Sequence, residues 1–262
     1  MTNSTISDNK LTIACIAALA YVVQDVMHEG VGHGLTAYLS GARHLTMSTV
    51  ALQSDTASRW IAANGTLVNL ALGLIFWLLL LKPQRYKPAT RLFLVLALAG
   101  NLFSGTGYFF FSGVANFGDW AQVIHGLQPY WAWRLGLLVL GIGSYYASML
   151  VVTAQLRSFL PDVEPSRRVR RLSWLPYVSE AGLALLAGLP NPAGLFYVVA
   201  SALPSTLGAN AGMLSFPSMM RGWKRREPEP VGPIPRSKGW IGTAIVVCLL
   251  FIVVLGRGVT FK

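Results

Sequence analysis

The sequence predicts an all-α protein that crosses a membrane several times. Of its 262 residues, 53% are hydrophobic and only 12% are charged. The mean hydropathy of +0.52 is too high for a water-soluble domain of this length. The apolar residues also fall into runs of about 20, the length with which an α-helix crosses the hydrocarbon core of a bilayer. We therefore predict a multi-pass membrane protein surrounded by the lipid bilayer.

Seven apolar runs are candidates for membrane spans. They cover residues 11–39, 60–81, 91–111, 131–156, 174–189, 193–215 and 239–259. The fifth and sixth come from one apolar stretch of 42 residues, which is too long for a single span. We divide this stretch at Pro190 and Pro192, because proline lacks a backbone donor and interrupts a helix. The sequence thus predicts about seven transmembrane helices.

The basic residues predict the orientation of these spans. Fifteen of the 21 Lys and Arg residues lie in the segments 82–91, 157–171 and 221–238. With seven spans, these three segments share one side of the membrane, which the positive-inside rule makes cytoplasmic. We therefore expect a cytoplasmic N-terminus and an external C-terminus. This distribution accounts for the net charge of +11 without a nucleic-acid partner.

The loop after the first span predicts the one departure from helical structure. Residues 44–52 are rich in Thr and Val and alternate in part between polar and apolar side chains. This pattern is typical of strands. A short β-hairpin at the external rim of the membrane is the expected result.

The first span ends in an unusual group of ionisable residues. Two of the four histidines and two of the ten acidic residues lie between Asp25 and His33. Such side chains are costly within a membrane and indicate function there. His28, Glu29 and His33 follow the zinc-peptidase pattern H-E-x-x-H with one extra residue. On a regular helix the two histidines point about 140° apart, whereas a π-bulge reduces the angle to about 50°.

Two other interpretations of this group stay open. On a regular helix, Asp25, Glu29 and His33 are spaced i, i+4 and i+8 and share one face. Glu29 and His33 would then be the metal ligands, with His28 supporting them. Alternatively, these polar groups satisfy one another in a helix bundle without metal.

A third metal ligand is expected from a loop on the same side of the membrane. Asp119 follows the third span on the predicted external side, and the preceding Gly118 lets the backbone approach closely. His44 and His125 lie on the same side and are weaker candidates.

With these residues, the chain resembles the site-2 protease family of intramembrane zinc metallopeptidases, especially its divergent bacterial members. The resemblance spans about residues 15–125 and lies in the segments 28–43, 64–69 and 118–119. It implies that His28, His33 and Asp119 bind one zinc ion and that Glu29 is the catalytic general base. It also implies that Asn69 lies near the site.

The resemblance implies a function and an organisation. The chain is expected to be a zinc metalloprotease of the bacterial inner membrane that hydrolyses peptide bonds of membrane-embedded proteins or peptides. Residues 1–130 would form a metallopeptidase-like core of three spans, and residues 131–262 a helical bundle of about four spans, in one integral membrane unit. The histidine spacing and the missing Asp-Gly pair depart from the family. The alternative is therefore a catalytically inactive membrane subunit that serves as a structural or partner-binding component of a membrane complex.

Overall fold

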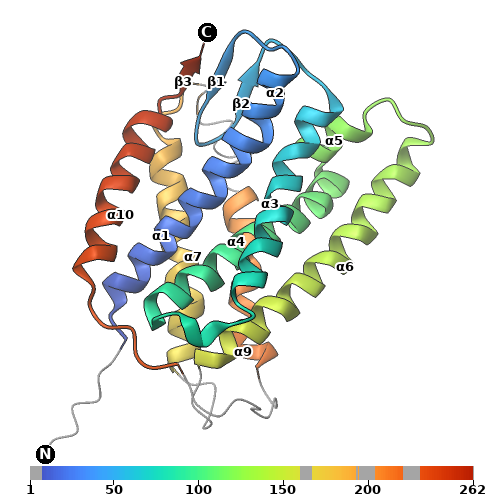
Figure 1. Cartoon of the computed structure of the whole chain (residues 1–262). Coiled ribbons are helices and arrows are strands. Elements are labelled where there is room, and N and C mark those ends of the chain that lie inside the picture. The colour runs from blue at the N-terminus through green and yellow to red at the C-terminus, as the bar shows by residue number, and fades with distance from the viewer. Residues whose placement is uncertain (1–7, 160–166, 193, 195–203, 221–230, 262) are drawn as a thin grey trace, which may run out of the picture.

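A computed structural model describes residues 8–159, 167–192, 194, 204–220 and 231–261 of the chain. The described part is mostly helical, and the long helices pack side by side with a small sheet at one end (Figure 1). The helical segments, including π and 3-10 turns, are α1 (Lys10–Val26), η1 (Met27–Leu35), α2 (Thr36–Leu39), α3 (Arg59–Leu79), η2 (Pro83–Arg85), α4 (Pro88–Ala115), α5 (Asp119–Ile124), α6 (Tyr130–Leu156), η3 (Arg157–Phe159), α7 (Arg167–Gly188), η5 (Pro204–Gly208), η6 (Ala209–Ser215), α9 (Phe216–Met219), α10 (Lys238–Leu250) and η7 (Phe251–Leu255). The strands are β1 (Leu45–Met47), β2 (Leu52–Ser54) and β3 (Val259–Phe261).

Five helices in the described ranges are long and apolar enough to cross a membrane. They are Lys10–Leu39, Arg59–Leu79, Pro88–Ala115, Tyr130–Phe159 and Lys238–Leu255. Each coincides with a predicted span, so the prediction of a helical protein with several membrane-length helices is confirmed. The predicted number of seven spans is not confirmed, and the difference lies in the region between α6 and α10.

The fifth and sixth predicted spans have features that set them apart. All but the last residue of the predicted span 174–189 lies within α7, which begins with an arginine-rich turn and contains Pro176. This helix ends at Gly188, just before the predicted turn at Pro190. The span 193–215 includes residue 193 and residues 195–203, which lie outside the described ranges. Its described part is a π-helix followed by a 3-10 helix rather than an α-helix.

Helix α4 forms the centre of the bundle. In its most apolar window 78% of the residues are buried, compared with 22% for α6 and 11% for α10. The core residues of α4, such as Leu92, Leu96 and Phe103, pack against the buried face of α1, including Ile13 and Ile16. Many apolar side chains of α6 and α10 are instead exposed. This arrangement is typical of a bundle whose outer helices face lipid.

The sheet combines strands from the two ends of the sequence. The predicted hairpin is confirmed: β1 and β2 pair antiparallel, with Leu45 opposite Ser54. The sequence did not predict β3, which pairs with the other edge of β1 and places Phe261 opposite Leu45. The strand order is β2-β1-β3, so in the described part of the chain β2 has one unpaired edge.

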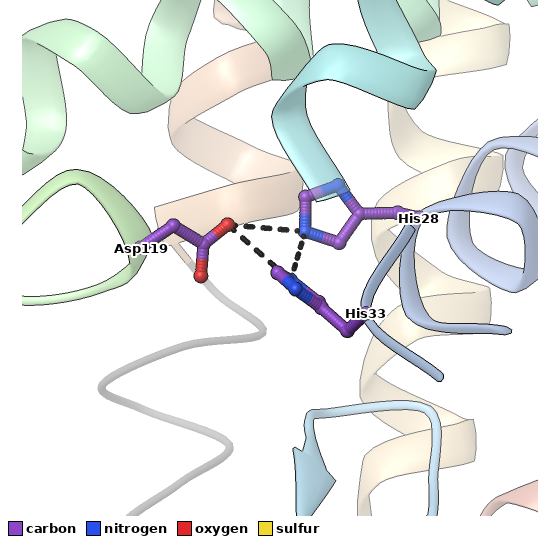
Figure 2. Close-up of side chains that lie close together, drawn as sticks. All are labelled: His28, His33 and Asp119. Atoms are coloured by element: carbon purple, nitrogen blue, oxygen red, sulfur yellow. Dashed lines mark hydrogen bonds and ion pairs between the residues drawn. The ribbon is translucent and has the colours of Figure 1, made fainter. Parts of the chain in front are cut away.

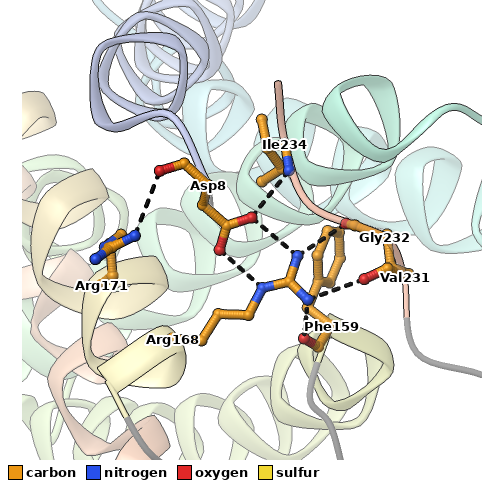
Figure 3. Close-up of polar contacts among 7 residues, drawn as sticks. All are labelled: Asp8, Phe159, Arg168, Arg171, Val231, Gly232 and Ile234. Atoms are coloured by element: carbon orange, nitrogen blue, oxygen red, sulfur yellow. Dashed lines mark hydrogen bonds and ion pairs between the residues drawn. The ribbon is translucent and has the colours of Figure 1, made fainter. Parts of the chain in front are cut away.

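A buried ion pair joins four segments at the opposite end of the bundle (Figure 3). The Arg168 guanidinium binds the Asp8 carboxylate through two contacts of 2.8 and 3.0 Å. It also donates to the carbonyl oxygens of Phe159, Val231 and Gly232 at 2.7–2.9 Å. The start of α7 is thereby tied to the segments before α1, after α6 and before α10. Parts of two predicted basic segments thus lie at the end of the bundle where α1 begins.

We expect Arg168→Met to lower the free energy of unfolding by about 3–5 kcal/mol, because it leaves the Asp8 carboxylate buried without its partner. The side chain of Asp8 is only 4% exposed. Thermal unfolding in detergent measures the effect. Arg170→Met, at an exposed position of the same helix, is the matched control and should change stability little. Equal losses in the two variants would contradict the role given to the ion pair.

Candidate metal centre

The first membrane-length helix changes its geometry where the histidines occur. Residues Met27–Leu35 form a π-helix that continues α1. The predicted bulge is confirmed, and the regular helix assumed in the alternative interpretation is wrong. The wider turn absorbs the extra residue between His28 and His33, so both imidazoles can point to the same side. His28, Glu29 and His33 are all buried.

The chain returns to these histidines through a tight connection after α4. Asn116 ends α4 in the left-handed conformation, with φ of 53°. Gly118 has φ of 82°, a value that L side chains rarely adopt. Asp119 then begins α5. The glycine predicted to permit close approach is therefore required by the turn that directs Asp119 toward the histidines.

Three side chains form a compact group (Figure 2). The Nε2 atoms of His28 and His33 are 3.1 Å apart. The Asp119 Oδ2 atom lies 3.3 Å from Nε2 of His28 and 3.4 Å from Nε2 of His33. Tetrahedral zinc with bonds of about 2.0–2.1 Å holds its ligand atoms about 3.3–3.4 Å apart. The three donor atoms thus have a spacing that fits the coordination of one metal ion.

The other nitrogen of each imidazole is held by an oxygen. His33 Nδ1 donates to the Ile61 carbonyl at 2.6 Å, and because a carbonyl only accepts, the hydrogen must be on Nδ1. His28 Nδ1 contacts Asn69 Oδ1. The Asn69 amide nitrogen donates to Asn101 Oδ1 at 2.8 Å, which fixes the oxygen toward His28. In the neutral imidazoles, these contacts leave the lone pair on Nε2, the form in which histidine binds metal.

The resulting arrangement favours a cation. Three lone pairs, on two imidazoles and on Asp119 Oδ2, converge within 3.4 Å. No other described residue donates a hydrogen bond to this buried carboxylate oxygen. Burial raises the pKa of Asp119, but where no cation is bound, protonated imidazoles of His33 and His28 lower it below its usual range. The carboxylate is therefore ionised, as a metal ligand must be.

A polar chamber opens beside this group. Its volume is about 470 Å³, and Glu29, His33 and Asp119 all line it. Oε2 of Glu29 is buried without a hydrogen-bond partner in the described part of the chain. Strand β2 lines the same chamber. The Glu29 side chain and strand β2, whose outer edge is unpaired in the described part of the chain, thus line the space next to the three ligand atoms.

The other candidate residues lie elsewhere. Among the described residues, neither Glu29 nor Asp25 belongs to the group of possible ligand atoms. The backbone of His44 donates to Asp55, and the carbonyl of His125 accepts from Arg59. The structure therefore brings together His28, His33 and Asp119, and it places Asn69 against His28.

Three supporting groups were missed by sequence reasoning. They are the Ile61 carbonyl, Asn101 and Gly65. Asn101 is a polar residue within an apolar run, a signal that could have been used. The carbonyl carries no sequence signal, because every residue has one. Gly65 matters because a Cβ there would lie 2.4 Å from Nε2 of His33 and 2.6 Å from Nε2 of His28.

We expect Gly65→Ala to abolish metal binding, since its methyl group would displace both Nε2 atoms. Metal content of the purified variant measures this. Gly136→Ala is the control, because no atom lies within 4 Å of a Cβ at that position. Full metal content in Gly65→Ala would show that the imidazoles do not hold the metal in this arrangement.

Comparison of the chain with known proteins found no family model, curated protein or solved structure that matches it.

Proposed function

We propose that the chain is an intramembrane zinc metalloprotease that hydrolyses peptide bonds of membrane-embedded proteins or peptides. One observation carries this proposal: the triangle of His28 Nε2, His33 Nε2 and Asp119 Oδ2, with edges of 3.1–3.4 Å, which shares a chamber with Glu29, whose Oε2 has no hydrogen-bond partner in the described part of the chain. Three nitrogen and oxygen ligands with an open fourth position are typical of catalytic rather than structural zinc. One zinc ion is the metal that this donor set fits best.

Each residue has a defined part in the proposed reaction. His28, His33 and Asp119 hold the metal, and their hydrogen bonds to Asn69 and Ile61 fix the two imidazoles. When bound, zinc supplies Lewis-acid chemistry that polarises a peptide carbonyl and activates water near neutral pH. Glu29 takes a proton from the attacking water and delivers it to the leaving amine.

The unpaired edge of β2 suggests how the substrate is presented. A peptide bond within a transmembrane helix is shielded by helical hydrogen bonds, so the substrate must become locally extended. An extended segment can pair with a free strand edge through backbone hydrogen bonds. Strand β2 lines the chamber that contains Glu29, so a paired substrate would lie beside the proposed base.

The proposed setting is the bacterial inner membrane, with a cytoplasmic N-terminus and an external C-terminus. The basic segments support this orientation through the positive-inside rule. With that orientation the metal site lies toward the external half of the bilayer, since the histidines follow α1.

Zinc-dependent hydrolysis by the reconstituted protein tests the proposal. The purified protein is placed in liposomes with a labelled transmembrane peptide of about 20 apolar residues interrupted by an Asn-Gly pair. We expect one zinc ion per chain, cleavage near the interruption, loss of cleavage with a chelator, and recovery on adding zinc. A purified protein without stoichiometric zinc, or cleavage that a chelator leaves unchanged, would overturn the proposal.

A second candidate is a catalytically inactive membrane subunit that binds partner subunits. The observation that favours it is that Asp119 lies 3.3–3.4 Å from both imidazoles, close enough for an imidazole–carboxylate ion pair without metal. Such an ion pair would stabilise the helix bundle without a bound metal. Absence of zinc and of hydrolysis, together with loss of thermal stability in Asp119→Asn, would identify this candidate.

A further inference from the structure

A second cavity lies on the side of the bundle formed by α4, α6 and the non-α segment η5–η6. Its volume is about 700 Å³, and its walls are mostly apolar. The wall residues include Phe110, Val114, Ile142, Tyr146, Gly208 and Ala211. Cavities of about 300–1,000 Å³ are typical of ligand sites. This cavity is large enough for several apolar side chains.

Specific contacts fix the elements that form the walls of the cavity. The Tyr145 hydroxyl accepts a hydrogen bond from the Gly212 amide at 2.8 Å and donates to the Ala209 carbonyl. This fixes η6 in its 3-10 conformation. On the opposite side, Gly141 lets α6 approach α4 so closely that a Cβ would lie 2.4 Å from the Phe110 nitrogen. Irregular backbone at membrane depth is tolerated where it lines a cavity, which is where η5 and η6 lie.

The cavity adjoins the polar chamber of the metal centre. Tyr108 and Phe111, about one turn apart on α4, line both spaces. The Tyr108 ring also stacks on the His28 imidazole, with ring centroids 5.3 Å apart and an angle of 21°. The partition between the two spaces is therefore in direct contact with a proposed metal ligand.

The geometry points to the apolar cavity as the subsite for large apolar side chains, of the Leu or Phe class, next to the scissile bond of a transmembrane substrate. This inference rests on the proposed function. A locally unwound transmembrane segment has a polar backbone and apolar side chains, and the two adjoining spaces match these two needs. The polar chamber, which β2 lines, takes the backbone, and the cavity beyond Tyr108 and Phe111 takes the side chains. A lipid tail has no backbone amide groups and so would not pair with the edge of a strand.

Gly208 offers a direct way to fill the cavity. It lines the cavity, has an ordinary helical φ of −71°, and no atom of the described residues lies within 4 Å of a Cβ built there. Gly208→Leu therefore occupies the space without a clash at the backbone. Gly143→Leu is the matched control, because Gly143 lies on α6 outside the cavity lining and a Cβ there also has no atom of the described residues within 4 Å. Gly107→Ala is a smaller filling variant, whose Cβ makes only ordinary contacts of 3.5 Å or more.

The test compares two model transmembrane peptides in liposomes. They are identical except for Leu or Ala on both sides of the central Asn-Gly pair. We expect the protein to prefer the Leu peptide. Gly208→Leu should lower kcat/KM for the Leu peptide by about tenfold or more, as expected when apolar contacts are lost in a hydrophobic pocket, and should leave the Ala peptide unchanged. Gly107→Ala should act in the same direction, and Gly143→Leu should affect neither peptide. Equal effects on both peptides, or none, would overturn the inference.

Binding separates this inference from the proposed function. Fluorescence anisotropy gives the Kd of each peptide for zinc-loaded Glu29→Gln, in which turnover is not needed. Combining Gly208→Leu with Glu29→Gln should raise the Kd of the Leu peptide by about tenfold and leave the Kd of the Ala peptide unchanged. If that selectivity is found but the native chain hydrolyses neither peptide, the subsite stands and the protease proposal fails. If the native chain hydrolyses both peptides while Gly208→Leu displaces only co-purified lipid, the proposed function stands and the subsite is overturned.

Discussion

Glu29→Gln is expected to reduce peptide hydrolysis by about 10²–10⁴-fold, the usual contribution of a general base, while one zinc ion stays bound. The amide cannot accept the proton of the attacking water, but it has nearly the size of the carboxylate. The ligand triangle contains His28, His33 and Asp119 and not Glu29, so metal content should not change. Hydrolysis of the labelled peptide and zinc analysis of the same preparation provide the two measurements.

Asp25→Asn is the matched control for this substitution. Asp25 is a carboxylate one helical turn earlier in α1, with its Oδ2 atom buried and unpartnered in the described part of the chain. It lies outside the ligand group. We expect it to lower hydrolysis far less than Glu29→Gln. Comparable losses in the two variants, or loss of zinc from Glu29→Gln, would contradict the assignment of Glu29 as the base.

His33→Ala is expected to release the zinc ion. The substitution removes one of three ligands and also the hydrogen bond to Ile61. Loss of a supporting hydrogen bond alone costs metal affinity about 10- to 100-fold, so loss of the ligand should cost more. Competition with a chromogenic chelator measures the affinity, and hydrolysis should disappear in parallel.

His125→Ala provides the comparison for His33→Ala. His125 follows α5, near Asp119 in sequence, but does not belong to the group of ligand atoms among the described residues. Its removal should leave zinc affinity unchanged. A retained zinc ion in His33→Ala would mean that the metal is bound elsewhere in the chain.

Much of the fold and of the site follows from local patterns in the sequence. The apolar runs predicted the five membrane-length helices, because spanning a bilayer requires both length and low polarity. The spacing of His28 and His33 indicated a π-bulge as the geometry that brings the two rings together, with a regular helix as the alternative, and the structure has the π-helix. Asp119 was predicted from its place after the third span. The helices and the π-bulge were inferred from residues close together in sequence. Asp119 was inferred from the side of the membrane on which its loop was expected.

The features that sequence reasoning missed depend on distant contacts. Strand β3 is three residues long, and its partner β1 lies more than 200 positions away in the sequence. The two strands are also linked by a hydrogen bond of 3.0 Å between the hydroxyl groups of Thr46 and Thr260. The need for Gly65 arises only when α3 packs against the imidazoles. The 3-10 geometry of η6 depends on the Tyr145 hydroxyl from α6. No local pattern reports such contacts.

The pairing of β3 with β1 has a practical consequence for assays. Phe261 lies in the same small sheet as β2, which lines the polar chamber. A fluorescent protein or affinity tag fused after β3 would therefore be attached to the same small sheet that contributes β2 to the chamber lining. The start of α1 is at the far end of the bundle (Figure 1), so fusion before Asp8 keeps a reporter away from the chamber.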